Sequence, residues 1–187
     1  MQAQEEIIDY AEHKKEIDKW ISLKGETKYL KFVAFLKLSN EPITWKNLSN
    51  TYRYDKRLLI NVFKYMSFFE EFLRAQIWNV SKITYKKLEA TFLNNAIDKV
   101  IELKNRICFH GFSIDTLIEN RDYINYLRNR ISHNKIMLES EKEGKNLKEL
   151  LLSFKITLPE SYREKFSFDI NSCNKGLDIP QQIVINI

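Results

Sequence analysis

The chain is poor in the residues that build disulfide scaffolds and metal sites. Its 187 residues include two cysteines and three histidines. Two cysteines do not make a disulfide framework, and the N-terminus carries no signal-peptide pattern, so Cys108 and Cys173 are expected to be reduced thiols in the cytoplasm. Cys108 and His110 stand without the neighbouring ligands that zinc needs, so no metal and no cofactor is expected. The longest apolar runs span a handful of residues, far fewer than a bilayer requires.

What is present is typical of a globular domain. Charged residues make up 29% of the chain and aromatic residues 13%, which excludes a disordered segment. The length suits one domain with a core of its own. The net charge of +5 and the pI near 9.0 favour a polyanionic partner, and the basic residues are concentrated towards the centre of the chain.

Apolar residues recur at helical spacing through most of the sequence, which predicts an all-α fold. Residues 1–50 are expected to form a helical extension, and residues 51–187 a helical bundle with a short C-terminal extension, the two packing as one unit. Thr44 is the expected cap of a third helix, and Asp55 the cap of the longest one. The segments expected to be helical are 1–23, 28–38, a short one from 44, 58–78, 84–103, 115–133, 147–154 and 159–168. Residues 105–113 are expected to form a connection, and residues 139–145 a polar turn. Residues 183–185 are expected to form either a strand or an extended segment.

One stretch combines residues suited to chemistry on an anion. Arg128, Asn129 and His133 fall within six residues, near the end of a segment whose apolar residues are Leu117, Ile118, Ile124, Leu127 and Ile131. On a helix, Asn129 and His133 lie one turn apart on the same face, and Arg128 can reach that face with its long side chain. The other reading of this stretch is a solvated basic helix face with a histidine at its C-terminal end.

The stretch from Arg128 to His133 resembles the signature of the HEPN superfamily, in which arginine and a polar residue precede a histidine. The longer stretch from Leu127 to Lys135 is similar to the Abi-like (AbiD/AbiF-type) abortive-infection branch of that superfamily. A second similarity lies upstream, where Glu70-Glu71-Phe72-Leu73-Arg74 resembles the Glu-x-x-Leu-Arg helix of that branch. Glu70 and Arg74 lie one helical turn apart, either as an ordinary surface ion pair or as supports of the active centre.

The resemblance implies a HEPN-like bundle that dimerises and cleaves RNA without a metal, in phage defence or toxin-like growth arrest. Imidazole can act as base or acid near neutral pH, and guanidinium can stabilise the charge on the phosphate. The expected catalytic residues are Arg128, Asn129 and His133. Glu70, Arg74, Arg130 and Lys135 are expected to support the site or bind RNA, and an antitoxin or a non-coding RNA is a possible further partner.

Two other functions are compatible with the sequence. The same basic face could bind RNA or a protein without cleaving anything, as a non-catalytic HEPN-like module. Alternatively, residues 28–57 could form a helix-turn-helix that binds DNA, although a helical pair packed on the main bundle is the simpler interpretation. Arg106 and His110 imitate the spacing of the motif but lack the following polar residue, so His110 is interpreted as structural.

Overall fold

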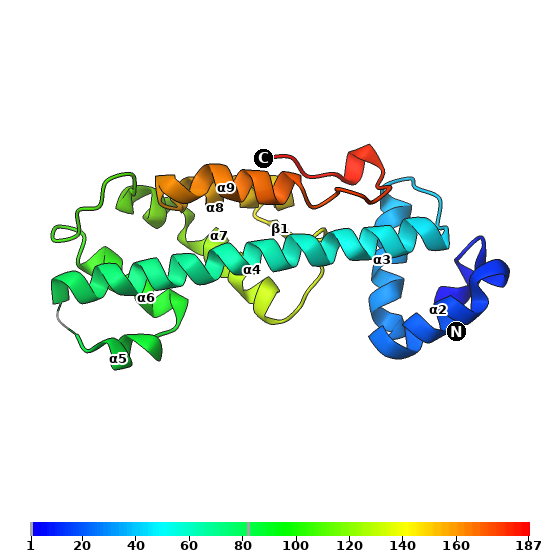
Figure 1. Cartoon of the computed structure of the whole chain (residues 1–187), viewed down its shortest axis with the longest axis horizontal. Coiled ribbons are helices and arrows are strands. Elements are labelled where there is room, and N and C mark those ends of the chain that lie inside the picture. Colours follow the sequence, from blue (N-terminus) through cyan, green and yellow to red (C-terminus); the bar gives the residue numbers. More distant parts are fainter. Residues whose placement is uncertain (1, 82) are drawn as a thin grey trace. The chain divides into compact units, whose positions relative to one another are not determined.

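The fold is all-α, as the sequence predicts. We describe it from a computed structural model that covers residues 2–81 and 83–187, with side chains described at all of these except 2, 3 and 85 (Figure 1). Among these residues the only strands are β1 (Glu141–Lys142) and β2 (Lys145–Asn146), which pair as a two-stranded antiparallel hairpin. The chain divides into two compact units, which we describe separately.

The N-terminal unit comprises the residues up to Arg57 together with residues 173–184. It contains α1 (Gln2–Glu5), α2 (Tyr10–Lys24), α3 (Glu26–Leu38), the start of α4 (Trp45–Ser81) and the 3-10 turn η1 (Gln181–Ile183). Its core is formed by residues such as Ile17, Phe32, Leu36 and Leu48, which are completely buried. Asn50 and Arg57 of α4 donate hydrogen bonds to backbone carbonyls of the C-terminal segment, which tie that segment to this unit.

The first predicted helix is interrupted in the structure. The backbone N–H of Ile8 donates to the carbonyl of Ile43, and the carboxylate of Asp9 accepts the N–H of Trp45 at 2.7 Å. These contacts to a segment more than 30 residues away take the place of helical hydrogen bonds between α1 and α2. Only part of the apolar sequence within the predicted helix 1–23 is buried: Ile17 and Ile21 are buried, whereas Ile8 and Ala11 are exposed.

The predicted short helix after residue 44 and the long helix after it form one continuous 37-residue helix, α4. Thr44 caps it as predicted, since its hydroxyl accepts the N–H of Asn47 at 3.2 Å. Asp55 was expected to cap the long helix, and this is wrong: it lies inside α4 and is completely buried. Asp55 lies on the buried side of α4, where Tyr54 and Leu58 are also completely buried.

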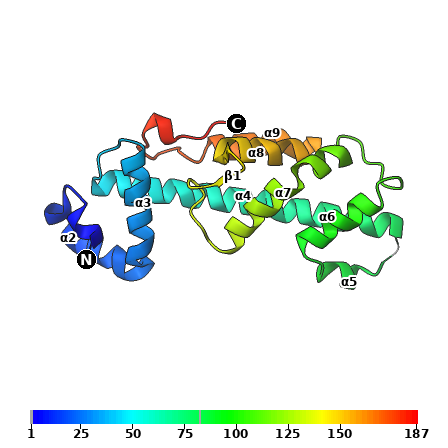
Figure 2. The ribbon, with the colours of Figure 1, turned by 180° about the vertical axis from the view of Figure 1, so that it is seen from behind.

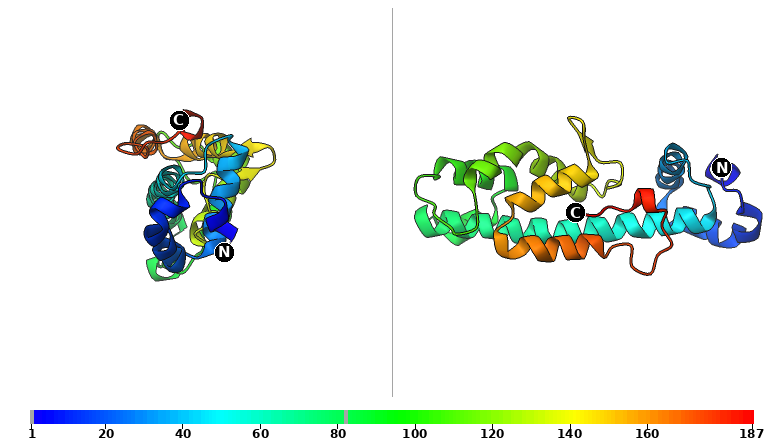
Figure 3. Two further views of the ribbon diagram at one scale, coloured as in Figure 1. Left: turned by 90° about the vertical axis from the view of Figure 1, so that its right-hand side faces the viewer. Right: turned by 90° about the horizontal axis from the view of Figure 1, so that it is seen from above.

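The central unit comprises residues 58–172 and 185–187. It contains the rest of α4, then α5 (Tyr85–Glu89), α6 (Leu93–Glu102), α7 (Ile114–Ser132), the hairpin, α8 (Leu147–Thr157) and α9 (Glu160–Asn171). Figure 2 shows α6 and α7 beside this part of α4, and Figure 3 shows α8 and α9 along it. Aromatic contacts join the helices: Phe69 of α4 meets Phe154 of α8 at 5.9 Å between ring centroids, and Phe154 meets Phe166 of α9 at 5.5 Å.

The structure tests three predicted details of the chain after residue 83. The helix expected over 84–103 is two helices, α5 and α6, because the chain turns at residues 90–92, where the Thr91 carbonyl accepts a hydrogen bond from Arg74. The connection at 105–113 is confirmed, so Arg106 and His110 do not lie on a helix. Residues 183–185, predicted as either a strand or an extended segment, form no strand: Ile183 ends the 3-10 turn η1, and 184–187 belong to no helix or strand. The backbone of Ile187 exchanges two hydrogen bonds with the side chain of Asn171.

Both cysteines are free thiols, Cys108 exposed and Cys173 buried. Within the described residues, no helix is both long enough and apolar enough to cross a membrane.

Candidate functional site

Helix α7 carries the motif and is held in the central unit by its apolar face. The Ser113 hydroxyl caps its first turn by accepting the N–H of Thr116 at 3.2 Å. Leu117, Ile124 and Leu127 are completely buried, whereas Ile118, which was predicted to be buried with them, is 41% exposed. With this face packed inward, Arg128 lies at the edge of the core and Asn129 faces solvent.

The end of α7 determines where the histidine lies. His133 is the C-cap residue, and its backbone N–H donates to the Asn129 carbonyl at 3.1 Å, so the predicted spacing of one turn holds. Asn134 follows with φ +49°, and the N–H groups of Asn134 and Lys135 donate to the carbonyls of Ile131 and Arg130, each at 2.9 Å. This is a Schellman motif, in which a left-handed residue ends the helix. The polar residue after His133 therefore terminates α7 and leaves the His133 side chain exposed.

Glu70 connects the two sequence motifs. It lies on α4, where its carboxylate pairs with Arg74 at 3.1 Å, and it faces the Arg128 side chain of α7 with 3.9 Å between Oε1 and Nε. Arg74 also donates to the Thr91 carbonyl at 2.9 Å. The side chains of Glu70 and Arg74 are only about 20% exposed, so this contact is better shielded from water than a typical surface ion pair. Two arginines separated by 54 positions thus share one carboxylate.

A pocket of about 190 Å³ opens beside this contact. Arg128 and Glu70 supply its charged groups, Ser67 and Ser132 its hydroxyls, and Phe63, Met66 and Ile131 its apolar surface. The Arg128 side chain is 30% exposed, which leaves part of its guanidinium accessible from the pocket. Asn129 and His133 are exposed residues at the same end of α7 and do not line the pocket.

Arg130 and Lys135 were predicted to support the site or bind RNA. The Arg130 guanidinium donates to the Ile136 carbonyl and to the Tyr126 hydroxyl, and it lies 5.8 Å from the centre of the Tyr126 ring. These contacts hold the segment that follows α7 against the helix. The side chain of Lys135 is exposed.

Sequence reasoning missed the pocket residues Phe63, Ser67 and Ser132. Phe63 and Trp78 fall within the helix predicted over 58–78, but their side chains are 58% and 45% exposed. Both continue the helical pattern of apolar residues, so the pattern could not distinguish them from core residues. The signal in the sequence was that Phe63 lies about two helical turns before Glu70, on the same side of the helix as the charged motif.

Comparisons with models of known families, with curated proteins and with solved structures find no match to this chain. No group of three or more histidine, cysteine, aspartate or glutamate side chains in the described part of the chain is arranged to hold a metal ion.

Proposed function

We propose that this protein is a metal-independent endoribonuclease of the HEPN type, whose active site forms where two copies of the chain meet. The observation that carries the proposal is the convergence of the two motifs on Glu70: this carboxylate holds Arg74 and contacts Arg128 beside an open pocket. Arg128 lies five residues before His133, at the same end of α7. The contact of 3.9 Å between Glu70 Oε1 and Arg128 Nε places the arginine of one motif beside the ion pair of the other, which the spacing within either helix does not require.

In the proposed reaction, the 2′-hydroxyl of the substrate attacks the adjacent phosphorus, and the bond from phosphorus to the 5′-oxygen breaks. One His133 imidazole removes the proton from the 2′-hydroxyl, and a second imidazole, in its protonated form, donates a proton to the leaving 5′-oxygen. Arg128 stabilises the negative charge that develops on the phosphate oxygens. The products carry a 2′,3′-cyclic phosphate and a 5′-hydroxyl. Asn129 orients His133 or the ribose through its amide.

A dimer is proposed because each copy contributes one motif histidine, His133, whereas the reaction needs two proton transfers. The surface next to the site also favours association: Ile60 and Phe63, one turn apart on α4, are 61% and 58% exposed. Covering such side chains with a second copy removes apolar area from water. A two-fold axis near Phe63 would bring the pocket and His133 of one copy towards those of the other.

The resemblance to the Abi-like branch suggests the biological role, which is phage defence or growth arrest through RNA cleavage. Such an enzyme needs restraint in an uninfected cell, and an antitoxin or a non-coding RNA would supply it. We propose that it acts in the cytoplasm, on cellular or phage RNA.

The proposal is tested by incubating a labelled single-stranded RNA with the protein in EDTA and analysing the product ends. We expect the wild type to release 2′,3′-cyclic phosphates and His133→Ala to lose cleavage by a factor of at least about 10². His110→Ala is the matched control, because His110 is also exposed but lies in the 105–113 connection. Equal cleavage by wild type and His133→Ala would remove the basis for this site. RNA binding without cleavage by the wild type would favour the non-catalytic module.

A further inference from the structure

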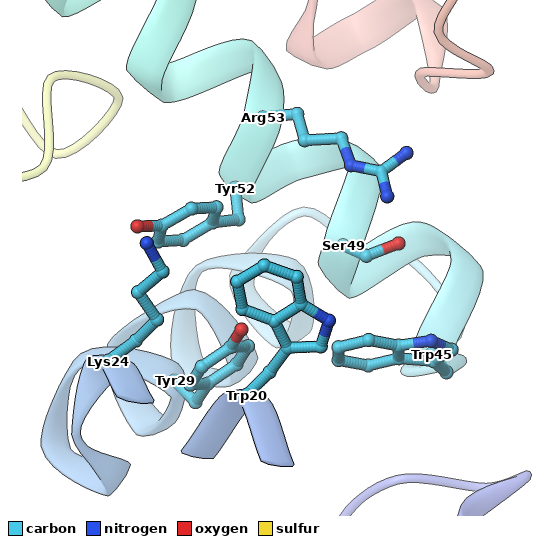
Figure 4. A pocket seen from close by; sticks show the side chains of 7 residues that line it. All are labelled: Trp20, Lys24, Tyr29, Trp45, Ser49, Tyr52 and Arg53. Carbon is cyan, nitrogen blue, oxygen red and sulfur yellow. The ribbon is translucent and has the colours of Figure 1, made fainter. Parts of the chain in front are cut away.

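The N-terminal unit contains a second pocket, built mainly from aromatic side chains. Its volume is about 120 Å³, and its lining residues come from α2, α3 and the first turns of α4 (Figure 4). They are Trp20, Lys24, Tyr29, Trp45, Ser49, Tyr52 and Arg53. Clefts that hold drug-sized ligands have volumes of roughly 300–1,000 Å³, so this pocket suits a single planar ring system.

The aromatic rings differ in how much of their surface a ligand can reach. Tyr29 and Trp45 are buried, with 3% and 6% exposed, and form the floor of the pocket. Their centroids lie 6.2 Å apart, and the Tyr29 ring stacks on Tyr52 at 6.0 Å with 10° between the planes. Burial also raises the pKa of Tyr29 to about 12, so this floor stays uncharged. Trp20 and Tyr52 are only half-buried and form the accessible walls.

Positively charged side chains lie near the rings of Trp20 and Tyr52. The Lys24 Nζ lies 5.4 Å from the centre of the Trp20 ring and 5.8 Å from that of Tyr52, and the Lys56 Nζ lies 5.8 Å from Tyr52. Burial and the neighbouring Lys28 and Lys24 ammonium groups lower the pKa of Lys56 to about 8, although Asp55 opposes the shift. Figure 4 shows the Lys24 amine near Tyr52 and the Arg53 guanidinium at the other end of the pocket.

The positive charge of Lys24, Lys56 and Arg53 determines which kind of ligand the pocket can bind. An aromatic cage can bind a quaternary ammonium group, but Lys24, Lys56 and Arg53 would repel a cation. A ligand with a flat ring and a negative charge satisfies both parts of the pocket. Nucleotides have this combination, and proteins that bind single strands use the same two elements, an aromatic platform for the base and a basic groove for the backbone.

We propose that this pocket binds a nucleotide of single-stranded nucleic acid, with its base against Trp20 and Tyr52 and with the two phosphates that flank this nucleotide at Lys24 and at Arg53. In a duplex the faces of the bases are covered by their neighbours, so the pocket discriminates against duplexes. Stacking on aromatic rings and contacts to phosphates depend little on base identity or on the 2′-hydroxyl, so we expect the pocket to accept RNA and DNA alike. The site lies entirely within the N-terminal unit and does not depend on the proposed cleavage.

Two measurements on the full-length protein test the proposal. Anisotropy of a labelled short oligothymidylate gives the affinity, and quenching of tryptophan fluorescence reports stacking. DNA lacks the 2′-hydroxyl that the proposed cleavage requires, so binding is measured without cleavage. We expect Trp20→Ala to weaken binding at least about tenfold, as loss of base stacking does elsewhere, while Trp78→Ala, a half-exposed tryptophan of the central unit, leaves it unchanged.

The proposed phosphate contact of Lys24 is tested by a matched pair of variants. Lys24→Ala should lower the slope of log affinity against log salt by about 0.7, the value for one phosphate contact with a single strand. Lys19→Ala removes the same charge from the same helix outside the pocket and should leave the slope unchanged. Circular dichroism confirms folding, and Trp20→Leu replaces Trp20→Ala if the smaller side chain unfolds the unit.

The proposal is overturned if folded Trp20 variants bind oligothymidylate as the wild type does. It is also overturned if a duplex of the same length binds as tightly, or if an acidic tyrosine-rich peptide quenches the tryptophans and the oligonucleotide does not. The last result would assign the pocket to a protein partner.

Discussion

Glu70 is the residue on which the candidate site depends. It is the shared partner of Arg74 and Arg128, and all three side chains are largely shielded from water. Removing the carboxylate leaves two positively charged guanidinium groups near each other without the negative charge that lies between them. Arg74 keeps its bond to the Thr91 carbonyl, but Arg128 loses its ionic neighbour.

We therefore expect Glu70→Gln to lower the free energy of unfolding by about 1–3 kcal/mol and to reduce RNA cleavage. Urea unfolding and the RNA assay measure the two effects. Glu71→Gln is the matched control, because Glu71 is exposed on the same helix and should change stability by less than about 0.5 kcal/mol. Similar behaviour of the two variants would mean that the contact with Arg128 has no energetic weight.

Gly111 has two reasons to be glycine. Its φ is +77°, and a Cβ placed on it would lie 2.9 Å from the Cβ of Glu160, at the start of α9. Gly144, in the hairpin, has the same φ but nothing within 4 Å of the corresponding position. Comparing alanine substitutions at Gly111 and Gly144 therefore separates the energetic cost of backbone strain from that of a steric clash.

We expect Gly144→Ala to destabilise the protein by about 1 kcal/mol, the usual cost of a left-handed alanine. Gly111→Ala should destabilise it more, because Glu160 donates its N–H to the Gly111 carbonyl at 2.9 Å and has to move. Thermal unfolding of the two variants gives the difference. Equal melting temperatures would show that α9 accommodates the extra methyl group.

At the scale of elements, Asp169 attaches α9 to α4. Its carboxylate accepts hydrogen bonds from Lys64 at 2.7 Å and Tyr65 at 2.9 Å on α4, and from Lys165 at 2.9 Å on its own helix. Burial by itself would raise the pKa of Asp169, but these three donors together lower it from 3.8 to about 2. Burial and the bond to Asp169 raise the pKa of Tyr65, so its hydroxyl remains a donor.

The lowered pKa predicts a loss of stability in acid. The folded state binds this proton less tightly than the unfolded state, so the contribution is present above pH 4 and disappears as the pH falls towards 2. A shift of this size corresponds to about 2 kcal/mol. We expect Asp169→Asn to lose about that much at neutral pH and to show a flatter stability curve in acid, measured by urea unfolding.

Asp98→Asn provides the comparison, since Asp98 pairs with Arg121 on the surface, where the two side chains are 51% and 41% exposed. Such a pair contributes less than about 1 kcal/mol. If the two aspartate variants lose equal stability, the attachment of α9 depends on apolar contacts such as Phe154 with Phe166 and not on Asp169.

At the scale of the whole molecule, the exposed apolar residues of α4 bear on the proposed dimer. We expect Phe63→Glu to produce a monomer in analytical ultracentrifugation and to abolish RNA cleavage, because a buried carboxylate at the interface would be unpaired. Phe168→Glu introduces the same change at an equally exposed phenylalanine of α9 and should leave the dimer intact. A Phe63→Glu protein that is still dimeric would place the interface elsewhere.

Much of the fold followed from the pattern of residues. Helices such as α3, α7 and α8 appear within a few positions of the predicted bounds, because each has a cap or a stop nearby in sequence, as Ser113 and Asn146 illustrate. Two errors arose where distant contacts replaced helical ones: Asp9 bonds to Trp45, and Arg74 bonds to the turn that divides α5 from α6. The error at Asp55 was the opposite, because the helix continues through this buried residue. The candidate site divides in the same way, since the spacing of Asn129 and His133 was readable and the exposure of Phe63 was not.

The sequence by itself determined the all-α class, the helix that carries Arg128, Asn129 and His133, and the spacing of one helical turn between Glu70 and Arg74. These depend on interactions within one or two helical turns, which local spacing specifies. The tertiary structure decided that Glu70 faces Arg128, that Arg130 holds the segment after α7, and that Trp20 and Tyr52 line one pocket. Such pairs lie far apart in the chain, and only the packing of apolar faces determines which side chains meet.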